Sequence, residues 1–272
     1  MDTRCCNINQ EVFIMTLKEK LLSGQKIYGC MIRVVRNPAI CLFAKTAGLD
    51  FIMFDCEHSN YTTETLHDCF IHANSIGLGG FLRATSLSKD NISRPLDQGA
   101  TGVMVPMTET VEQAQGLVKW SKYAPVGDRG FCSGTGMVAY NTSLSHAQII
   151  QHANNSVISI AQIETKLSVD NAEKIAAVNG IDALLIGPND LSFSLGIPGD
   201  LLNPIEIDAM KHVAAACKKH GKAFGIHAGP KVLEKFADEL TLVMMQGDVD
   251  ILAAGFKNIN DTARRVNGET IG

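Results

Sequence analysis

The sequence lacks the features that would mark a secreted, membrane-spanning or disulfide-rich protein. Its eight cysteines include no C-x-x-C pair and do not follow the spacing of a small secreted domain, so we expect reduced thiols. No apolar run approaches the roughly 18 residues that a membrane span needs. The first residues, MDTRCCNINQEV, carry Asp, Asn and Glu where a signal peptide would be apolar. These absences predict a cytoplasmic protein that does not engage a membrane.

Charge of one sign is not concentrated anywhere in the chain. The formal net charge is -4, and no long run of acidic or basic residues occurs. A nucleic-acid-binding surface is therefore not indicated. A small anionic substrate would have to be held by a local site and not by the field of the whole protein.

The sequence also lacks repeats, low-complexity tracts and an interdomain linker, which predicts one domain over residues 1–272. The chain has 272 residues, of which 46% are hydrophobic, enough for a large core. This length fits a (β/α)8 barrel, which typically needs about 250 residues.

Eight short apolar runs are the predicted strands. Most are continuous and do not alternate with polar residues, which is typical of parallel strands buried on both faces. They are Ile27–Val34, Phe51–Phe54, Gly80–Arg83, Gly102–Val105, Val157–Ile163, Ala183–Ile186, Ala223–Ile226 and Leu240–Met245.

Helical patterns separate these strands. Residues 66–76 and 207–217 keep helical spacing and end at Gly77 and Gly221, and a further helix is expected from Asn171 to Asn179-Gly180. A long insertion, 121–156, is expected to carry a helix near 145–152, and residues 1–16 to lie across the barrel bottom or to fray. Alternating strands and helices favour a closed (β/α)8 TIM barrel, with an open parallel sheet as the alternative.

Polar residues follow most of the predicted strands. Barrel enzymes carry their catalytic groups at the carboxyl ends of the strands, so these residues are expected to share one rim. They are Asp55, Glu57 and His58 after the second strand, Arg83 at the third, Gln162 and Glu164 at the fifth, Gly187, Asn189 and Asp190 at the sixth, His227 at the seventh and Gln246 to Asp248 at the eighth.

Glu164 and Asp190 are the candidate metal ligands. Two carboxylates completed by water suit a hard divalent cation such as Mg²⁺ or Mn²⁺. Such a cation can bind a 2-oxoacid and stabilise an enolate as a Lewis acid. The alternatives are that Asp190 caps a short helix over 191–195 and that Glu164 forms a rim salt bridge.

Arg83 and His58 are the candidate catalytic side chains. Arg83 ends an apolar strand, where its guanidinium would either stabilise a developing oxyanion or form a buried ion pair with a rim acid. His58 could accept a proton near neutral pH or be a structural histidine, and His227 is a weaker candidate. The turn Gly187-Pro188-Asn189 could receive a carboxylate on its backbone amides or be only a loop.

Six motifs stand in an order and spacing that resembles the HpcH/HpaI aldolase family, the class II pyruvate aldolases. The resemblance covers roughly residues 17–256. It implies a (β/α)8 barrel, usually hexameric, with an exchanged C-terminal helix between paired subunits. The motifs are FDCEHSNYTTETL, FLRATS, LDQGATGVMVPM, PVGDRGF, AQIET and IGPNDLSFSLG.

The resemblance also implies roles for individual residues. Glu164 and Asp190 would hold a divalent metal ion, Mg, Mn or Co. His58 would act as the base through a water molecule, and Arg83 would stabilise the enolate. Asp97, which reads from the residues alone as a surface position of the third helix, would raise the basicity of His58.

Substrate contacts are implied for the side chain of Gln162 and the backbone of Asn189, beside Gly187. The sequence departs from the family pattern at Cys56 and in the segment 134–136. These departures leave open which aldehyde the protein takes, but they do not affect the expected enolate chemistry.

The implied reaction is metal-dependent cleavage of a 4-hydroxy-2-oxoacid, such as a 2-keto-3-deoxy sugar acid or a 4-hydroxy-2-oxo-dioate, to pyruvate and an aldehyde through a pyruvate enolate. One alternative is a CoA-ester lyase of the citrate or malyl lyase type. That activity would need a basic site for the CoA phosphates, and no cluster of Arg or Lys lies near the predicted rim. The other is a degenerate barrel that binds a metabolite or serves as a scaffold, although the catalytic positions are all filled.

Overall fold

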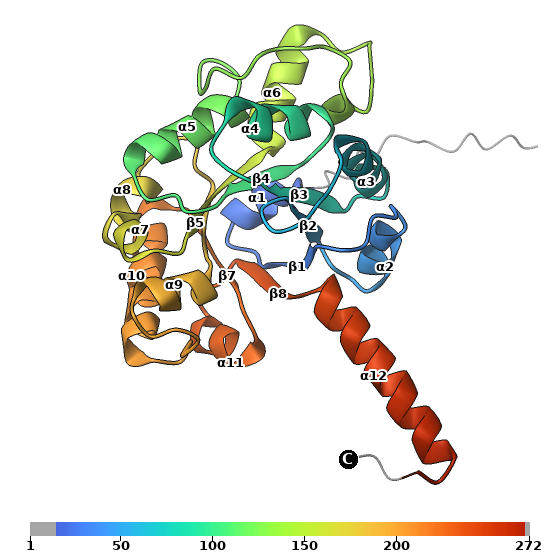
Figure 1. Ribbon diagram of the computed structural model, residues 1–272. Coiled ribbons are helices and arrows are strands. Elements are labelled where there is room, and N and C mark those ends of the chain that lie inside the picture. The colour runs from blue at the N-terminus through green and yellow to red at the C-terminus, as the bar shows by residue number, and fades with distance from the viewer. Residues whose placement is uncertain (1–14, 270–272) are drawn as a thin grey trace, which may run out of the picture.

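The protein forms a closed barrel of eight parallel strands that neighbour one another in chain order (Figure 1). The computed structural model describes residues 15–269. The predicted (β/α)8 barrel is confirmed and the open sheet is wrong. The strands are β1 (Ile27–Ile32), β2 (Phe51–Asp55), β3 (Gly79–Arg83), β4 (Gly102–Val105), β5 (Ile158–Ile163), β6 (Ala183–Ile186), β7 (Ala223–His227) and β8 (Leu242–Gly247).

Side chains two residues apart on each strand fill the interior of the barrel. Ile158 and Ile160 do so on β5, and Ile27 and Met31 do so on β1, where Gly29 occupies the inward position between them. The intervening residues pack outward against the helices, so each strand is buried on both faces. Continuing the inward alternation past the apolar layers brings polar side chains to the barrel mouth. They are Arg33, Asp55, Arg83, Gln162 and His227.

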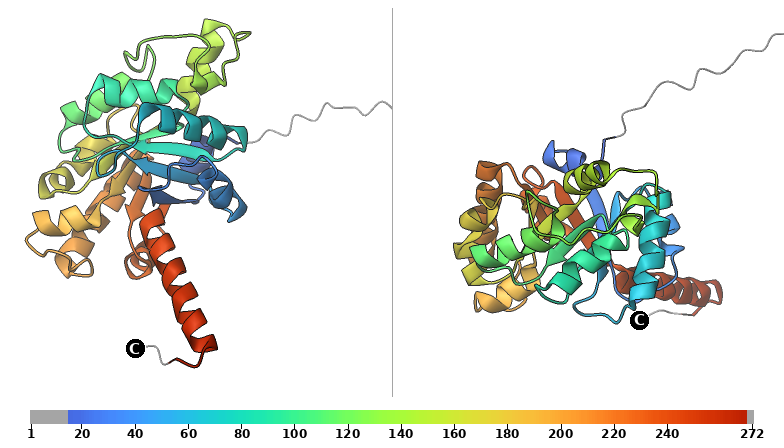
Figure 2. Two further views of the ribbon diagram at one scale, coloured as in Figure 1. Left: turned by 45° about the vertical axis from the view of Figure 1, so that its right-hand side comes forward. Right: turned by 90° about the horizontal axis from the view of Figure 1, so that it is seen from above.

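Helices surround the barrel in chain order, as two further views show (Figure 2). The helix α3 confirms its prediction: Thr62 caps it by accepting a hydrogen bond from the Thr65 amide, and Gly77, with φ of 66°, follows its end. The helices are α1 (Leu17–Leu22), α2 (Ile40–Thr46), α3 (Thr63–Ser75), α4 (Lys89–Asp97), α5 (Val111–Ser121), α6 (His146–Ser156), α7 (Lys166–Asp170), α8 (Ala172–Ala176), α9 (Pro188–Ser194), α10 (Pro204–His220), α11 (Pro230–Leu233) and α12 (Asp248–Val266), with the short 3-10 helices η1 (Gly136–Val138) and η2 (Glu234–Phe236).

Two helix predictions have different outcomes. The insertion carries α6, which Ser145 caps by accepting from the Gln148 amide, so the helix expected near 145–152 is present and runs longer. The helix expected from Asn171 to Asn179-Gly180 is present as α8, which Asn171 precedes, but it ends earlier, at Ala176; a second short helix, α7, lies directly before Asn171. The expectation for residues 1–14 lies outside the described residues.

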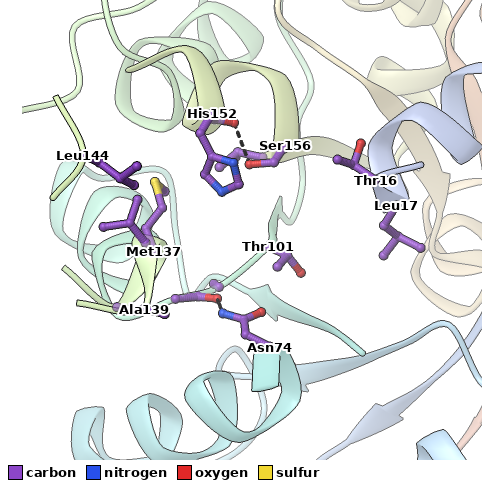
Figure 3. A pocket seen from close by; sticks show the side chains of 14 residues that line it. Thr16, Leu17, Asn74, Thr101, Met137, Ala139, Leu144, His152 and Ser156 are labelled. Carbon is purple, nitrogen blue, oxygen red and sulfur yellow. Dashed lines mark hydrogen bonds between the residues drawn. The ribbon is translucent and has the colours of Figure 1, made fainter. Parts of the chain in front are cut away.

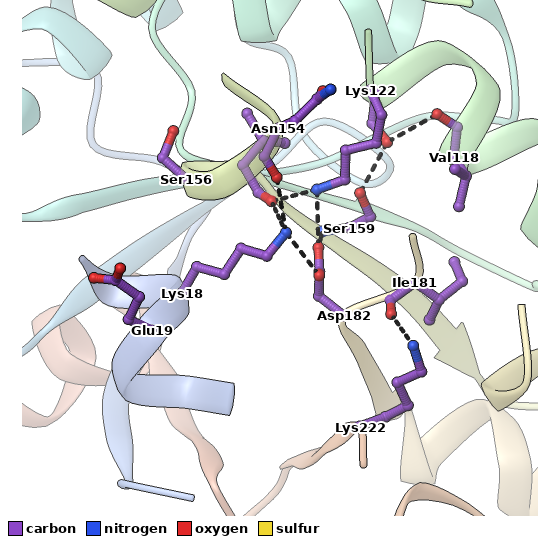
Figure 4. Close-up of polar contacts among 12 residues, drawn as sticks. Lys18, Glu19, Val118, Lys122, Asn154, Ser156, Ser159, Ile181, Asp182 and Lys222 are labelled. Carbon is purple, nitrogen blue, oxygen red and sulfur yellow. Dashed lines mark hydrogen bonds and ion pairs between the residues drawn. The ribbon is translucent and has the colours of Figure 1, made fainter. Parts of the chain in front are cut away.

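The end of the barrel opposite the predicted rim is closed by a buried charge network (Figure 4). Asp182, which precedes β6, lies 3.0 Å from Lys122 Nζ and 2.9 Å from Lys18 Nζ, and it also accepts from the Ser159 amide at 2.8 Å. Burial lowers the pKa of Lys122, while the Asp182 carboxylate opposes that effect. The network joins α1 and the end of α5 to the barrel floor, and its lysines are occupied by protein acceptors.

The C-terminal helix α12 extends away from its own barrel (Figures 1 and 2). Its large apolar side chains are exposed, among them Ile251 at 50%, Phe256 at 67% and Ile259 at 65%. Within residues 15–269 we find no helix whose length and apolar character would let it cross a membrane. The apolar face of the amphipathic helix α12 is thus not covered by other parts of the described chain.

Candidate active site

A buried arginine with two carboxylates lies on the β2–β3 side of the barrel mouth. Arg83 donates from Nε and Nη2 to the two carboxylate oxygens of Asp55, at 2.9 and 2.6 Å, and its Nη1 lies 3.0 Å from Glu57 Oε2. Burial disfavours both charges, yet the pairing lowers the pKa of Asp55 and raises that of Arg83. The predicted buried ion pair is present, and it holds Arg83 at the position where catalysis was expected.

His58 stands beside this ion pair on the loop after β2. Its backbone amide donates to Asp55 Oδ1 at 3.2 Å, so the aspartate fixes the loop as well as the arginine. The imidazole is 60% exposed, and its Nε2 lies 3.7 Å from Glu57 Oε2. The base predicted from sequence is thus at the mouth and open to solvent or substrate.

Glu164 is a buried carboxylate that directly follows β5 at the same mouth. Its Oε1 accepts from the Met107 amide at 2.7 Å and its Oε2 from Gln162 Nε2 at 2.5 Å. Burial, together with the negative charges of Asp190 and Glu57, raises its pKa to about 7 against the lowering effect of the Met107 amide. No ion pair to Glu164 occurs among the described residues, so the rim salt bridge is not seen there.

Met107 is a site residue that the sequence did not reveal. Its φ of 46° lies in the left-handed region that a non-glycine residue enters at a cost. In this conformation its amide points at Glu164 while its side chain is 52% exposed. A motif of composition or spacing could not have signalled it, because the backbone and not the side chain makes the contact.

Gly187 provides the space in which Glu164 and Gln162 meet. A Cβ at this position would collide with Glu164 Oε2 and lie 2.8 Å from Gln162 Nε2. The Gln162 Oε1 atom is buried and has no hydrogen-bond partner within the described chain. A buried acceptor without a donor, beside a buried carboxylate, fits a site built for an additional group.

Replacing Gly187 by alanine should displace the Glu164 carboxylate. We expect loss of stability of about 1–3 kcal/mol from the overpacked methyl group, together with weaker divalent-metal binding. Gly229→Ala is the matched control, since a Cβ there meets no atom within 4 Å. Urea unfolding and metal titration of both variants measure the difference; equal behaviour of the two would contradict this account.

Asp190 lies in the first turn of α9, but Gly187 is the residue that precedes the helix. The alternative of a capping aspartate is therefore wrong. Asp190 and the neighbouring Asn189 are exposed, and the charge of Asp190 contributes to raising the pKa of both Glu164 and Glu57. Asp190 thus lies within electrostatic range of Glu164.

The donor set fits a divalent cation with open positions. No group of three or more His, Cys, Asp or Glu side chains that could hold a metal occurs within residues 15–269. A cation at Glu164 and Asp190 would therefore complete its shell with water and substrate oxygens, as hard cations commonly do. It would also offset the burial and the neighbouring carboxylates that raise the Glu164 pKa.

Asp97 does not contact His58 within the described chain. Its Oδ1 accepts from Arg129 Nη2 at 2.6 Å, and the Arg129 guanidinium also stacks over the Tyr123 ring, 4.8 Å from its centroid. The expected pairing of Asp97 with His58 is thus not formed inside one chain. The pair that is formed ties α4 to the insertion, and the Arg129 side chain is fully buried.

A cavity of about 450 Å³ lies elsewhere, near the amino ends of β4 and β5 (Figure 3). It is lined by α1 residues, by η1 and by His152 and Ser156 of α6. Thr101 and Val157, which precede these strands, lie at its wall, so it opens at the end of the barrel away from Glu164. It is not part of the candidate active site.

The closed barrel and its mouth define an α/β-barrel enzyme with acidic, basic and imidazole groups at the carboxyl ends of the strands. Residues 33–248 match the HpcH/HpaI aldolase/citrate lyase family, and the chain belongs to it.

Individual relatives agree with this assignment. A 2-dehydro-3,6-dideoxy-6-sulfogluconate aldolase from Pseudomonas putida is 36% identical over 71% of this chain and 75% of its own length. A 5-keto-4-deoxy-D-glucarate aldolase from Klebsiella pneumoniae is 31% identical over 81% of this chain and 85% of its length. The crystal structure of an HpcH/HpaI aldolase from Desulfitobacterium hafniense superposes with a TM-score of 0.87 at 30% identity, covering 92% of this chain and 97% of that one.

Proposed function

We propose that this protein is a metal-dependent aldolase that cleaves a 4-hydroxy-2-oxoacid to pyruvate and an aldehyde. The observation that carries the proposal is the buried Glu164 carboxylate, whose pKa is raised by burial and by Asp190, at the same barrel mouth as Arg83 and His58. The relatives named as aldolases support this chemistry.

Glu164 and Asp190 would hold the divalent cation, with Mg²⁺, Mn²⁺ or Co²⁺ as the candidates. When bound, the cation supplies a Lewis acid for the 2-oxo and carboxylate oxygens of the substrate. Gln162, whose Oε1 lacks a partner among the described residues, and the Gly187–Asn189 turn would orient the 2-oxoacid.

Arg83 and His58 would act on the bond that breaks. Asp55 and Glu57 fix the guanidinium, which leaves N–H groups on Nη1 and Nη2 to stabilise the developing enolate oxygen. His58 would take the proton of the 4-hydroxyl through a water, so that the C3–C4 bond electrons pass to the pyruvyl fragment. Since Asp97 meets Arg129 within one chain and its side chain is 33% exposed, we propose that it serves His58 between copies of the chain.

We also propose a homo-oligomer, a hexamer with exchanged α12 helices, in the cytoplasm. The exposed apolar side chains of α12 support the exchange, because apolar surface of this kind is costly in water. The six described cysteines are free thiols, as expected of a reducing compartment.

Deuterium exchange at C3 of pyruvate tests the function without knowledge of the aldehyde. We expect the purified protein in D₂O to exchange the methyl protons of pyruvate with Mg²⁺, Mn²⁺ or Co²⁺ and to stop after chelation, as followed by proton NMR. Absence of exchange with all three ions would overturn the proposal. A retro-aldol screen of 4-hydroxy-2-oxoacids of varied length then identifies the aldehyde.

The CoA-ester lyase alternative gains no support from the described residues. A citrate lyase beta subunit from M. tuberculosis, solved with oxaloacetate and magnesium, matches with a TM-score of 0.54 at 15% identity, which shows the fold alone. Magnesium is nevertheless a sensible first ion for the exchange experiment.

A further inference from the structure

A second arginine, Arg33, lies at the barrel mouth and has no part in the proposed reaction. Ile27 and Met31 are the inward residues of β1, and the same alternation carries Arg33 to the axis side of the mouth. In a closed barrel of eight strands in chain order, β1 stands across from β5. Arg33 therefore lies on the wall opposite Gln162 and Glu164.

The Arg33 guanidinium keeps most of its donors free. Its Nε atom is buried without a hydrogen-bond partner in residues 15–269, and its one ion pair, to Asp250, is long at 3.8 Å. The side chains of this pair are partly exposed, Arg33 by 37% and Asp250 by 54%, so the ion pair contributes little to stability. Asp248 is not a competing partner, because its carboxylate accepts the backbone amides of residues 33–35.

This position differs sharply from that of Arg83. Asp55 and Glu57 balance the positive charge of Arg83 through three contacts of 2.6–3.0 Å, although N–H groups on its Nη1 and Nη2 remain to donate. Arg33 has no equivalent pair of carboxylates among the described residues. Of the two arginines at the mouth, Arg33 is the one with positive charge to offer.

The end of β8 is shaped to accommodate this guanidinium. A Cβ on Gly247 would lie 3.2 Å from Arg33 Nη2 and 3.3 Å from the Met31 carbonyl oxygen, so the side chain lies close over the Gly247 backbone. The Arg33 side chain is thereby held against the ends of β1 and β8, at the mouth of the barrel.

His227 of β7 lies in the same part of the mouth. Burial lowers its pKa, and the nearby charges of Arg83 and Arg33 lower it further, against the hydrogen bond of its Nε2 to the Gln246 carbonyl. The imidazole is thus held neutral near Arg33, the guanidinium that lacks a close pair of carboxylates in the described chain, so the charge that a ligand would meet in this part of the mouth is that of Arg33. An anion is the complementary ligand.

We propose that Arg33, with His227 beside it, binds an anionic group at the far end of the aldehyde fragment, a carboxylate or a sulfonate. This inference rests on the proposed aldolase function. With the 2-oxoacid end at Glu164 and Asp190, a substrate chain crossing the mouth ends at the β1 wall. The planar guanidinium fork matches the oxygens of such a group, so the substrate class is a dianionic 4-hydroxy-2-oxoacid.

A pair of matched aldehydes tests the proposal. Succinic semialdehyde carries a carboxylate at its far end, and butanal has the same four carbons without a charge. In aldol addition to pyruvate we expect the protein to prefer succinic semialdehyde. Arg33→Gln should lower its kcat/KM for that aldehyde by about 10- to 100-fold, while the value for butanal stays within about twofold.

Two further variants separate the role of Arg33 from a general loss of structure. Arg33→Lys keeps the charge and loses the fork, so we expect an intermediate loss. Arg36→Gln is the matched control, because Arg36 lies in the same loop and its guanidinium donates to the carbonyls of Val34 and Asn60 and lies over the Tyr61 ring. It should keep the wild-type preference.

Pyruvate deuteration separates this inference from the function on which it rests. The exchange needs no aldehyde, so its absence in the wild type overturns the aldolase proposal itself. Exchange retained in Arg33→Gln, with the preference for succinic semialdehyde lost, supports the anion site. If the wild type shows no such preference, or if Arg33→Gln lowers both aldehydes equally, the anion site is overturned and the aldolase stands.

Discussion

Replacing Glu164 by glutamine should abolish pyruvate C3 exchange while leaving the fold intact. Loss of the carboxylate removes one of two proposed metal ligands, and we expect a rate loss of about 10³-fold or more, roughly 4 kcal/mol at 1.36 kcal/mol per factor of ten. The glutamine carbonyl can still accept the Met107 amide. The Gln162 side chain can turn so that its Oε1, which lacks a partner in the described chain, accepts from the new amide.

Stability distinguishes this loss of metal from a loss of fold. The pKa of Glu164 is raised from 4.5 to about 7 in the folded protein. As pH rises through that interval, the unfolded chain releases its proton first, so the free energy of unfolding falls. At pH 8 without metal, Glu164→Gln should therefore melt at or above the wild-type temperature. Mg²⁺ should raise the melting temperature of the wild type and not of the variant.

Glu173→Gln is the control for Glu164→Gln, since the Glu173 side chain is exposed on α8 and pairs with Lys219 on the surface. It should retain both exchange and metal-dependent melting. Exchange at the wild-type rate in Glu164→Gln would remove Glu164 from the metal site.

Replacing Asp55 by asparagine should be the most destabilising single change at the mouth. Asp55 is fully buried and binds Arg83 through both oxygens, so its loss leaves a buried guanidinium with Glu57 alone. We expect a fall in the free energy of unfolding of about 3–5 kcal/mol at pH 7, measured by urea unfolding. Exchange should fall as well, because Asp55 also holds the His58 loop.

The pH dependence of this effect has a defined sign. The folded pKa of Asp55 lies below 3.8, so its stabilisation is complete above the unfolded pKa and is lost as pH falls through the folded one. The difference in the free energy of unfolding between the wild type and Asp55→Asn should become smaller only below about pH 4. Asp170→Asn, which breaks an exposed pair with Lys166, should change stability by less than about 0.5 kcal/mol. A cost for Asp55→Asn as small as that of this control would contradict the ion-pair account.

Much of the barrel was predictable because its strands are buried on both faces. A parallel strand between core and helices reads as a continuous apolar run, and all eight runs proved to be strands with ends shifted by a few residues. The rule that barrel enzymes carry their chemistry at strand ends then pointed to Glu164, Asp190, Arg83 and His58. The family resemblance, and not the pattern, named Asp97.

The contacts among these residues were not predictable in the same way. The sequence left open whether Arg83 faces a substrate or a rim acid, and the structure pairs it with Asp55 and Glu57. It left open whether Asp190 caps a helix, and the structure assigns that position to Gly187. Met107 contributes only an amide in a strained conformation, which no residue pattern announces.

Arg33 shows most clearly what the sequence predicts about a residue and what only the structure reveals. The predicted first strand ran to Val34, which hid Arg33 inside an apolar run, whereas β1 ends at Ile32. Side-chain alternation along β1 alone could have placed it on the inner face. Its meaning depends on β8, because Gly247 and Asp250 lie next to it only once the barrel has closed.

The sequence by itself thus determined the order of the strands, the barrel class and the strand ends that carry polar groups, since these follow from local apolar pattern and chain length. Tertiary structure alone decided which charges are neutralised and which remain free. Burial and distance set those properties, and both arise only when β8 closes against β1 and residues remote in the chain meet at one mouth. The buried Glu164 and the free donors of Arg33, on opposite walls of that mouth, are the result.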